Sequence, residues 1–498
     1  MSRTVPPTDP VLLEVAGRAV AVDDARPVYQ RIADGIAAGI DGGRLRPGDR
    51  LPTHRALASE LGVAVPTISR AYREAQQRGL ISGTVGRGTF ITGIPSLRDR
   101  PGTDSPARVD LSVNAPARGE HEHLLRASLR ATADAADLSG LLSYEADIGG
   151  PADRAVAADW LSLGGWRPDP ANVVICHGGQ HAILVALGAV VRPGGTLLTE
   201  ALTYPGVKVA AQLLGLRVVG VEMDEHGILP AALDEAAAVG ADPAGAAAMS
   251  GAPLDARRPT AVYLMPTAHN PTAITLSPTR RREVIAVARR RDLSIIEDDV
   301  FGLLAPEHDR PFPLAALAPE RTLHLSSLSK TVTPGLRWGA IVAPAQLTDR
   351  LGALVRASIF NPAPVALALA RRWLTDGTAE RMLAWQRAEL ADRFATAERL
   401  LAGRPAVRSL RTGGLHAWLD LAEPWTPAEV VAAAARLGVD LGPTSFFHAD
   451  PSGPTAALAR GIRLCLGNAA ELASLDAALT ALADALDRGP TFASGTRV

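Results

Sequence analysis

Two patterns of hydrophobic and polar residues divide the chain. Between residues 25 and 93, apolar residues recur at helical spacing, beginning with Val28, Ile32, Ile36 and Ile40. From Asp110 onward, short strand-like runs alternate with helical ones, which is typical of a mostly parallel sheet flanked by helices. We therefore expect an α/β fold with a small helical domain (25–93), a linker (94–109), a large domain (110–370) and a smaller α+β subdomain (371–490).

The first domain shows a recognisable order of elements. Thr53 suits the N-cap of a short helix that ends at Gly62. A second helix is expected from about Pro66 to Arg78, and Gly79 suits its C-terminal end. A hairpin should follow from Leu80 to Ile91. Helix, turn, helix and hairpin is the order of a winged helix-turn-helix. The inner face of the second helix should be formed by Ile68, Tyr72 and Ala75.

The positive net charge of this domain indicates what it binds. Residues 26–90 contain ten Arg and five Asp or Glu, which gives +5 and leaves −6 for the remainder of a chain of net charge −1. Such an asymmetry indicates a polyanion-binding module. Side chains on the outward helix surfaces and at the hairpin tip would contact double-stranded DNA. They are Arg55, Thr67, Ser69, Arg70 and Arg87. The alternative is a small helical cap with a solvated basic face.

A resemblance supports DNA binding. The segment RLRPGDRLPTHRALASELGV, with TISRAYREAQQRGLI and GRGTFI after it, resembles the DNA-binding domain of GntR-type bacterial regulators. Many members carry Ser-Arg where this chain has Ala64-Val65, and often Ser where it has His54. These departures concern affinity and operator preference rather than fold.

Polar clusters follow several strands of the large domain, where open α/β sheets place their ligands. Helix-opening glycines that suit a phosphate follow VVIC at Gly178-Gly179. Hydroxyls and an amine follow TLHL, with Arg337 seven residues after Lys330. Glu297-Asp298-Asp299 ends another strand, and a further strand leads to His269-Asn270.

The lysines narrow the chemistry, because only Lys208 and Lys330 occur among 51 Lys and Arg. A lysine, a phosphate cradle and a strand-end carboxylate are what pyridoxal phosphate requires. The blander alternatives are a surface lysine and helix-capping acids. The lysine, the phosphate cradle and the carboxylate occur together at the ends of successive strands, and this coincidence favours the cofactor.

The motifs SLSKTVTPGLRWG, HNPT, IIEDDVFG and IRLCLGN resemble those of class I aminotransferases of fold type I over residues 110–485. The resemblance implies that Lys330 binds the cofactor covalently, Asp298 pairs with its ring nitrogen and Asn270 contacts its phenolate oxygen. It implies a stacking role for Tyr204 and a substrate carboxylate on Arg463. The phosphate would be held by Gly179, Gln180, Ser327, Ser329 and Arg337, and by Tyr144 of the neighbouring subunit. Lys208 matches no catalytic position and is expected on a helix surface.

Two departures concern this site. The family often has Ser at the position of Gly179, and usually a tyrosine, which hydrogen-bonds the phenolate oxygen, at the position of Phe301. Loss of that hydroxyl should weaken transaminase chemistry without preventing cofactor binding.

Composition excludes several classes of protein. Hydrophobic residues make up 47% of 498 residues, too many for a disordered chain. The longest apolar run, Ala182–Val191, is half the length of a membrane span. Two cysteines, Cys176 and Cys465, leave no thiolate cluster for zinc, and no metal site is expected. No secretory signal is visible, so a cytoplasmic protein is expected. Residues 240–257 are small and turn-rich and predict a surface loop.

A GntR-type winged helix joined to an aminotransferase-like domain resembles the MocR subfamily of bacterial regulators. The resemblance implies a homodimer that binds an operator and senses pyridoxal phosphate or an amino compound bound to it. The alternative is an active aminotransferase with an accessory DNA-binding domain. Phe301 favours the regulator, whereas the intact set of Lys330, Asp298 and Arg463 keeps the enzyme open.

Overall fold

The structure is a computed structural model that divides into two compact units, Met1–Pro106 and Ala107–Val498. It describes residues 27–41, 44–45, 49–77, 80–84, 88–91, 108–119, 121–134, 138–238, 258–450 and 460–490. The expected hairpin tip at Arg87, the C-terminal Gly79 and the expected loop at 240–257 lie outside these residues.

The described residues of the small unit form three helices and a small antiparallel sheet. The helices are α2 (Val28–Asp41), α3 (His54–Leu61) and α4 (Val65–Gln77). The strands β1 (Arg50–Leu51), β2 (Ile81–Thr84) and β3 (Gly88–Ile91) pair in the order β1-β3-β2. This is the expected winged helix-turn-helix order. Its core is separate from that of the large unit and includes Ile32, Ile36, Leu57, Ile68, Tyr72 and Ala75, all buried.

Local chemistry explains the turn between α3 and α4. The Thr53 side chain accepts a hydrogen bond from the backbone N–H of Ala56 at 3.3 Å, so the predicted N-cap is confirmed. Gly62 ends α3 with φ 65°, a left-handed conformation that glycine adopts without steric cost.

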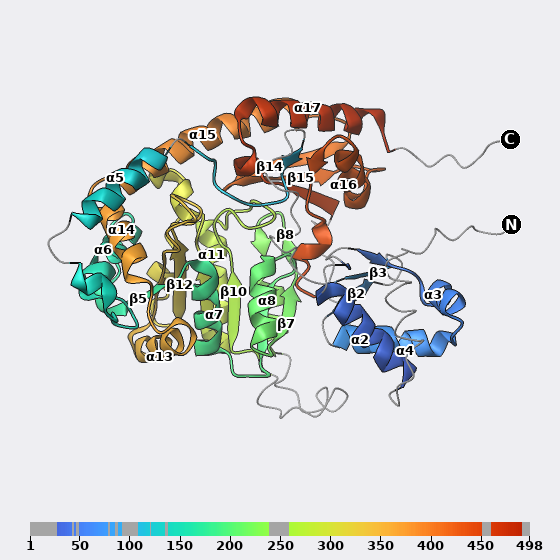
Figure 1. Ribbon diagram of the computed structural model, residues 1–498, viewed down its shortest axis with the longest axis horizontal. Helices are drawn as coiled ribbons and strands as arrows, with labels where there is room; N and C mark the ends of the chain where they lie inside the picture. The colour runs from blue at the N-terminus through green and yellow to red at the C-terminus, as the bar shows by residue number, and fades with distance from the viewer. Residues whose placement is uncertain are drawn as a thin grey trace. The chain divides into compact units, whose positions relative to one another are not determined.

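The large unit is built on a seven-stranded sheet in the order β5-β13-β12-β11-β10-β6-β7 (Figure 1). All neighbours are parallel except β13, which is antiparallel to β5 and β12. The strands are β5 (Val173–Cys176), β6 (Thr196–Glu200), β7 (Arg217–Val221), β10 (Ala261–Leu264), β11 (Ser294–Asp298), β12 (Thr322–Ser327) and β13 (Gly339–Val342). The mostly parallel sheet is therefore confirmed.

Helices cover both faces of this sheet. One face packs on α7 (Gly179–Val190), α8 (Pro205–Leu213) and α13 (Thr348–Ile359). The other packs on α9 (Pro230–Ala238), α11 (Pro278–Arg291) and α12 (Leu314–Leu317), and beside β5 on α6 (Pro151–Leu161) and α14 (Pro364–Thr375). A short pair, β8 (Met223–Asp224) and β9 (Gly227–Ile228), follows β7, and α5 (Glu122–Ala133) precedes α6.

The alternation of side chains along β11 separates its acidic residues. Ile296 packs on the α7 face, whereas Ile295 packs on the α11 face. Since strand side chains alternate between faces, Asp298 lies on the α7 face, and Glu297 and Asp299 lie on the α11 face. The three consecutive acidic residues therefore lie in two different environments, one on each face of the sheet.

The C-terminal part forms a second, smaller layer, to which the long helix α15 (Thr378–Leu401) leads (Figure 1). Its antiparallel sheet has the order β14-β15-β17. The elements are β14 (Val407–Gly413), β15 (His416–Leu421), α16 (Pro427–Arg436), β17 (Gly461–Leu464) and α17 (Leu472–Arg488). The parallel pair of β4 (Val109–Asp110) with β16 (Val439–Asp440) joins the start of the large unit to this layer.

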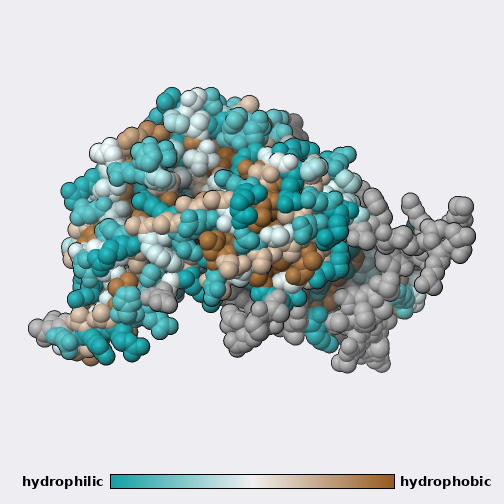
Figure 2. All heavy atoms as spheres, turned by 90° about the horizontal axis from the view of Figure 1, so that it is seen from above, coloured by the Kyte–Doolittle hydropathy of each residue, from teal (hydrophilic) through white to brown (hydrophobic). Residues whose placement is uncertain are grey.

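No helix among the described residues is long and apolar enough to cross a bilayer. On the face shown in Figure 2, hydrophobic residues form small groups between hydrophilic ones.

Candidate cofactor site

Lys330 lies just beyond the C-terminal end of β12. Its Nζ donates a hydrogen bond to the main-chain oxygen of Asn114 at 2.5 Å. Burial, and after it the positive charge of Arg463, lowers the pKa of Lys330 to about 8. A larger fraction of this amine is therefore uncharged near neutral pH than of an exposed lysine, as a nucleophilic lysine requires.

Asp298 ends the neighbouring strand β11 and is fully enclosed. Its Oδ2 accepts a hydrogen bond of 2.5 Å from the hydroxyl of Tyr263 on β10. Burial raises the pKa of Asp298 to about 6, although the Tyr263 hydrogen bond acts in the opposite direction. A positive group placed against this carboxyl would favour its ionised form, which suits a protonated ring nitrogen.

An anion cradle lies where β5 turns into α7. Gly178 has φ 80° and ψ 172°, a conformation essentially restricted to glycine. A Cβ on Gly178 would come within 2.5 Å of the Arg337 guanidinium, so that side chain lies against the turn. Arg337 Nη1 donates to Ser329 Oγ at 3.3 Å, and Ser327 Oγ is 3.0 Å from Ser329 Oγ. Helix N-terminal amides, hydroxyls and a guanidinium therefore converge as for a phosphate.

Gln180 and Tyr204 form a second contact across α7 and α8. Gln180 Nε2 donates to the oxygen of Gly206 at 2.9 Å, and the Tyr204 hydroxyl donates to Gln180 Oε1 at 3.2 Å. Burial raises the pKa of Tyr204 to about 12, and the charge of Asp298 contributes to the rise. The predicted stacking residue and Gln180 are thus brought together with Asp298.

Arg463 on β17 reaches the same place from the smaller layer. Its Nη1 donates to Asn270 Oδ1 at 2.7 Å, and its Nη2 donates to the oxygen of Ser112 at 2.5 Å. The Phe447 ring lies 4.7 Å from the guanidinium carbon. Asn270 thereby keeps its amide N–H groups for another acceptor, as expected of a contact to a phenolate oxygen.

Phe301 and Tyr144 occupy contrasting environments. Phe301 is buried, and its ring centroid is 5.7 Å from that of His416. Tyr144 is 82% exposed, and its ring centroid is 4.6 Å from that of Phe360. Tyr144 is therefore a surface residue of this chain, and its contact with the phosphate of a neighbouring subunit stays a prediction.

The expectation that Lys208 is a helix-surface residue is wrong. Its Nζ donates to the main-chain oxygens of Phe446 at 2.6 Å and His448 at 2.9 Å. Burial lowers the pKa of Lys208 to about 8. The acceptors are more than 230 residues away along the chain, so the local helical pattern gave no sign of them.

Sequence reasoning missed four polar residues around this site. Tyr263 and Asn114 contact Asp298 and Lys330, and His416 bonds to Asn114. Glu200 accepts a main-chain hydrogen bond from Met265 at 3.3 Å, beside the buried His269 ring. Tyrosine inside the apolar run AVYL was the one available signal, since a buried hydroxyl needs a partner.

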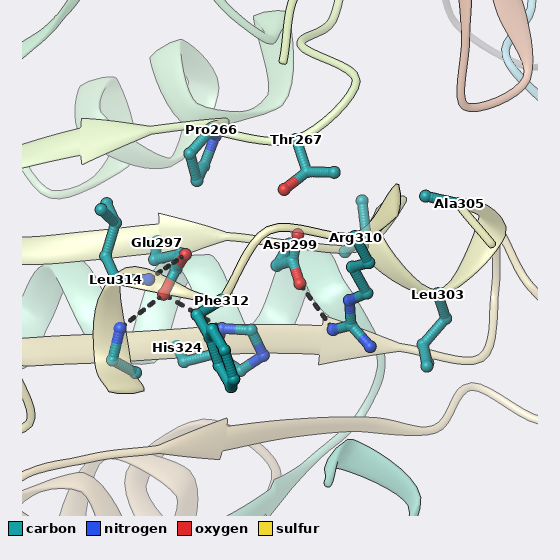
Figure 3. A network of polar contacts seen from close by, with 12 residues as sticks. Pro266, Thr267, Glu297, Asp299, Leu303, Ala305, Arg310, Phe312, Leu314 and His324 are labelled. Atoms are coloured by element: carbon teal, nitrogen blue, oxygen red, sulfur yellow. Dashed lines mark hydrogen bonds and ion pairs between the residues drawn. The ribbon is translucent and has the colours of Figure 1, made fainter. Parts of the chain in front are cut away.

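A network of buried charged and polar side chains lies on the α11 face of β11 (Figure 3). Glu297 accepts from the N–H groups of Leu314 and Ala315 at 2.7 and 2.9 Å, and lies 3.2 Å from His324 Nδ1. Asp299 accepts from Arg310 at 2.9 Å. Burial alone would raise the pKa of Asp299, but Arg310 and other positive neighbours hold it below its usual value. These contacts pair the buried acids and fix the strand that presents Asp298.

Four of the five predicted DNA-contacting residues lie on α3 and α4 of the small unit, and the fifth, Arg87, lies outside the described residues. Arg55 and Arg70 are exposed, and Arg70 lies 5.0 Å from the centroid of the Tyr29 ring. Thr67 is half-buried. Ser69 is half-buried too, and its Oγ is 3.0 Å from His54 Nδ1, so it is less free for DNA than expected.

The residues present fit pyridoxal phosphate. One place is surrounded by Lys330, whose pKa is lowered, by the enclosed carboxyl of Asp298 and by the anion cradle at Gly178. The buried Nε of Arg463 adds a donor without a partner. No group of three or more metal-ligating side chains occurs within the described parts of the chain.

Two family models match the chain. Residues 107–472 match aminotransferase class I and II, and residues 28–91 match the bacterial regulatory proteins of the gntR family.

Similar proteins include bacterial transcription regulators, and the match to the first of them is long enough to extend over both units. The uncharacterised regulator YdeF of Bacillus subtilis is 28% identical over 442 residues, which cover 88% of this chain and 91% of that protein. The regulator TauR of Rhodobacter capsulatus is 28% identical over 378 residues, which cover 68% of this chain and 72% of that protein.

Solved structures show the same fold in the large unit. An archaeal alanine:glyoxylate aminotransferase has a TM-score of 0.67 and 21% identity, with 77% of this chain and 91% of that chain covered. An α-aminoadipate aminotransferase of Thermus thermophilus, complexed with N-(5'-phosphopyridoxyl)-L-leucine, has a TM-score of 0.64 and 23% identity, with 77% and 93% covered.

Proposed function

The chain belongs to the aminotransferase class I and II family, and from that premise we propose that it is a transcription regulator in which an amino compound bound at the cofactor controls DNA binding. The GntR-type domain supports the DNA-binding role, as does the similarity to the regulators YdeF and TauR. Pyridoxal phosphate is the cofactor of the large unit. Sensing of an amino compound is the finer step of the proposal.

One observation carries the proposal. A single chain joins a basic helix-turn-helix to an enclosed Lys330–Asp298 pair whose pKa values burial moves toward neutrality, to about 8 and about 6. A DNA-binding protein without a ligand would gain nothing from burying two ionisable groups at such cost. The pair therefore indicates a bound group that uses both.

Different residues of the site would bind different parts of the cofactor and of the amino compound. When bound, pyridoxal phosphate supplies an aldehyde and an electron-withdrawing ring. Lys330 supplies the amine, Asp298 would hold a proton at the ring nitrogen, and the Gly178 turn with Arg337 would bind the phosphate. Arg463, already oriented by Asn270 and Ser112, would bind a carboxylate of the amino compound.

A second copy of the chain completes the proposal. Leu142 is 90% exposed and Tyr144 82% exposed, and Phe360 beside Tyr144 is exposed too. Exposed apolar side chains gathered in this way favour a protein interface. A homodimer would also bring two helix-turn-helix domains to one operator.

The test is a DNA-shift titration with the full-length protein, with and without pyridoxal phosphate and a panel of amino compounds. We expect at least one amino compound to change the apparent DNA affinity in the wild type. The Lys330→Ala variant should bind the same DNA without that response. An affinity that no amino compound changes in the wild type would refute sensing.

The intact Lys330, Asp298 and Arg463 favour one alternative, an active aminotransferase. Single-turnover half-transamination with amino acids separates the two functions. Turnover at about 1–10³ per second, typical of enzymes, would favour the enzyme.

A further inference from the structure

Resting on the proposed function, we propose that the amino compound carries a second hydrogen-bond donor, a hydroxyl or an amino group, which binds to Oδ1 of Asn114. This carboxamide would form a subsite beside the amine of Lys330 and the guanidinium of Arg463. The ligand class is then an amino acid with a polar, hydrogen-donating side chain rather than an apolar one.

The position of Asn114 supports this subsite. It lies in the segment between β4 and α5, whose main chain already contacts both binding groups. The oxygen of Asn114 accepts from Lys330 Nζ at 2.5 Å, and the oxygen of Ser112 accepts from Arg463 Nη2 at 2.5 Å. The Asn114 side chain is therefore anchored within reach of a molecule that occupies these two groups.

His416 fixes the orientation of the carboxamide. His416 Nε2 lies 3.2 Å from the oxygen of His269, and a carbonyl can only accept, so Nε2 carries the proton. Burial, and after it the charge of Arg463, lowers the pKa of His416 to about 3, so the ring is neutral. Its Nδ1 must then accept, and Asn114 Nδ2, at 3.1 Å, donates to it. Oδ1 of Asn114 is left on the other side of the carboxamide.

That oxygen is buried without a donor. Asn114 is 8% exposed, and Oδ1 has no hydrogen-bond partner among the described residues. Arg463 Nε is also buried and unpaired there. Because buried polar atoms are nearly always paired, an acceptor and a donor left open beside Lys330 indicate complementary groups on a bound molecule.

The inference can be tested by equilibrium binding to the full-length protein loaded with pyridoxal phosphate. The amino compounds are matched pairs that differ in one donor: L-alanine with L-serine, L-2-aminobutyrate with L-homoserine, and L-norvaline with L-ornithine. The change in visible absorbance on titration gives each Kd. In the wild type we expect the donor-bearing member of at least one pair to bind about tenfold or more tightly.

Asn114→Leu, of similar volume, removes the acceptor. We expect this variant to keep the visible absorbance of the bound cofactor and to lose the preference, so that both members of the pair bind within about twofold of each other. Asn172→Leu, which changes an asparagine directly before β5, at the end of that strand away from Gly178, is the matched control and should retain the preference. Asn114→Ala replaces the leucine variant if the latter does not fold.

Three outcomes overturn the inference: no preference in any wild-type pair, a preference that survives in Asn114→Leu or Asn114→Ala, or a preference lost equally in the control. A wild-type protein that binds cofactor and amino compounds but shows no preference refutes the subsite alone. A protein that binds no cofactor refutes the proposed function.

Discussion

At the scale of single residues, the two lysines should behave differently toward the cofactor. Both have a pKa of about 8, but Lys208 Nζ is held by two carbonyls, whereas Lys330 adjoins Asp298 and Arg463. We expect borohydride reduction of the cofactor-loaded protein to attach the cofactor to Lys330. Peptide mass spectrometry of the wild type and of Lys330→Ala checks this, with Lys208→Met as the control that should still be labelled. Label on Lys208 would refute the assignment.

Phe301 should tune the same site. A tyrosine hydroxyl there would donate to the phenolate oxygen of the cofactor, and a hydrogen bond to a charged oxygen contributes about 1.5–3 kcal/mol. That corresponds to about one or two pH units. In Phe301→Tyr we therefore expect the absorbance of the bound cofactor to titrate at a pH about one to two units lower, and half-transamination to be faster. The exposed Phe312→Tyr is the control, and an equal shift in both variants would contradict the argument.

The residues that sequence reasoning predicted share one property. Lys330, Asp298, Arg337 and Arg463 occur in motifs with a fixed spacing, and the structure places them around one site. Tyr263 and His416 were missed because their partners are distant in the sequence. Asp298, the partner of Tyr263, lies on another strand, and Asn114, the partner of His416, lies in the segment before α5. No spacing along the chain encodes such contacts.

At the scale of elements, Lys208 should hold two segments together. Thr203 N–H donates to the oxygen of Phe447 at 2.7 Å, and Ala449 N–H donates to the oxygen of Ala201 at 2.9 Å, next to the carbonyls that Lys208 binds. In Lys208→Met these carbonyls lose a charged donor, at a cost of about 1–3 kcal/mol.

Native-state hydrogen exchange measures this effect locally. We expect the protection of the Thr203 and Ala449 amides to fall about tenfold or more in Lys208→Met, since 1.4 kcal/mol corresponds to a factor of ten. Val209→Met, exposed on the same helix, is the control. Unchanged protection would mean that the backbone pairing alone holds the segments.

The strands and helices were predictable where a local pattern was strong. The runs VVIC and TLHL, expected as strands, lie in β5 and β12, and the strands expected before Asp299 and before His269 are β11 and β10. The antiparallel β13 was not predicted, because GAIV is short and its direction depends on pairing with β5 and β12. Local periodicity identifies a strand, but the direction of its neighbours depends on long-range contacts.

At the scale of the whole molecule, DNA binding should depend on dimer formation. The small unit has its own buried core, so the isolated segment 20–95 should fold. One winged helix neutralises few phosphates, whereas a dimer binds the second half-site at a high effective concentration. We expect the segment to bind a cognate operator weakly and the full-length protein about 10²-fold or more tightly, measured by fluorescence anisotropy at a fixed salt concentration. Equal affinities would show that the large unit contributes no dimer contact to binding.

Arg70 tests which surface of the small unit meets the DNA. The residue is exposed on α4, and its guanidinium lies 5.0 Å from the centroid of the Tyr29 ring, which limits where it can reach. If Arg70 contacts a base, Arg70→Ala in the full-length protein should weaken specific binding by about 1–3 kcal/mol. If Arg70 contacts a phosphate, the slope of log affinity against log salt concentration should fall by about one for every DNA sequence. Arg282→Ala, exposed on α11 of the large unit, removes the same charge elsewhere and should change neither quantity. Unchanged affinity and salt slope in Arg70→Ala would remove α4 from the DNA interface at this position, and the net charge of +5 would then act through other arginines of the small unit.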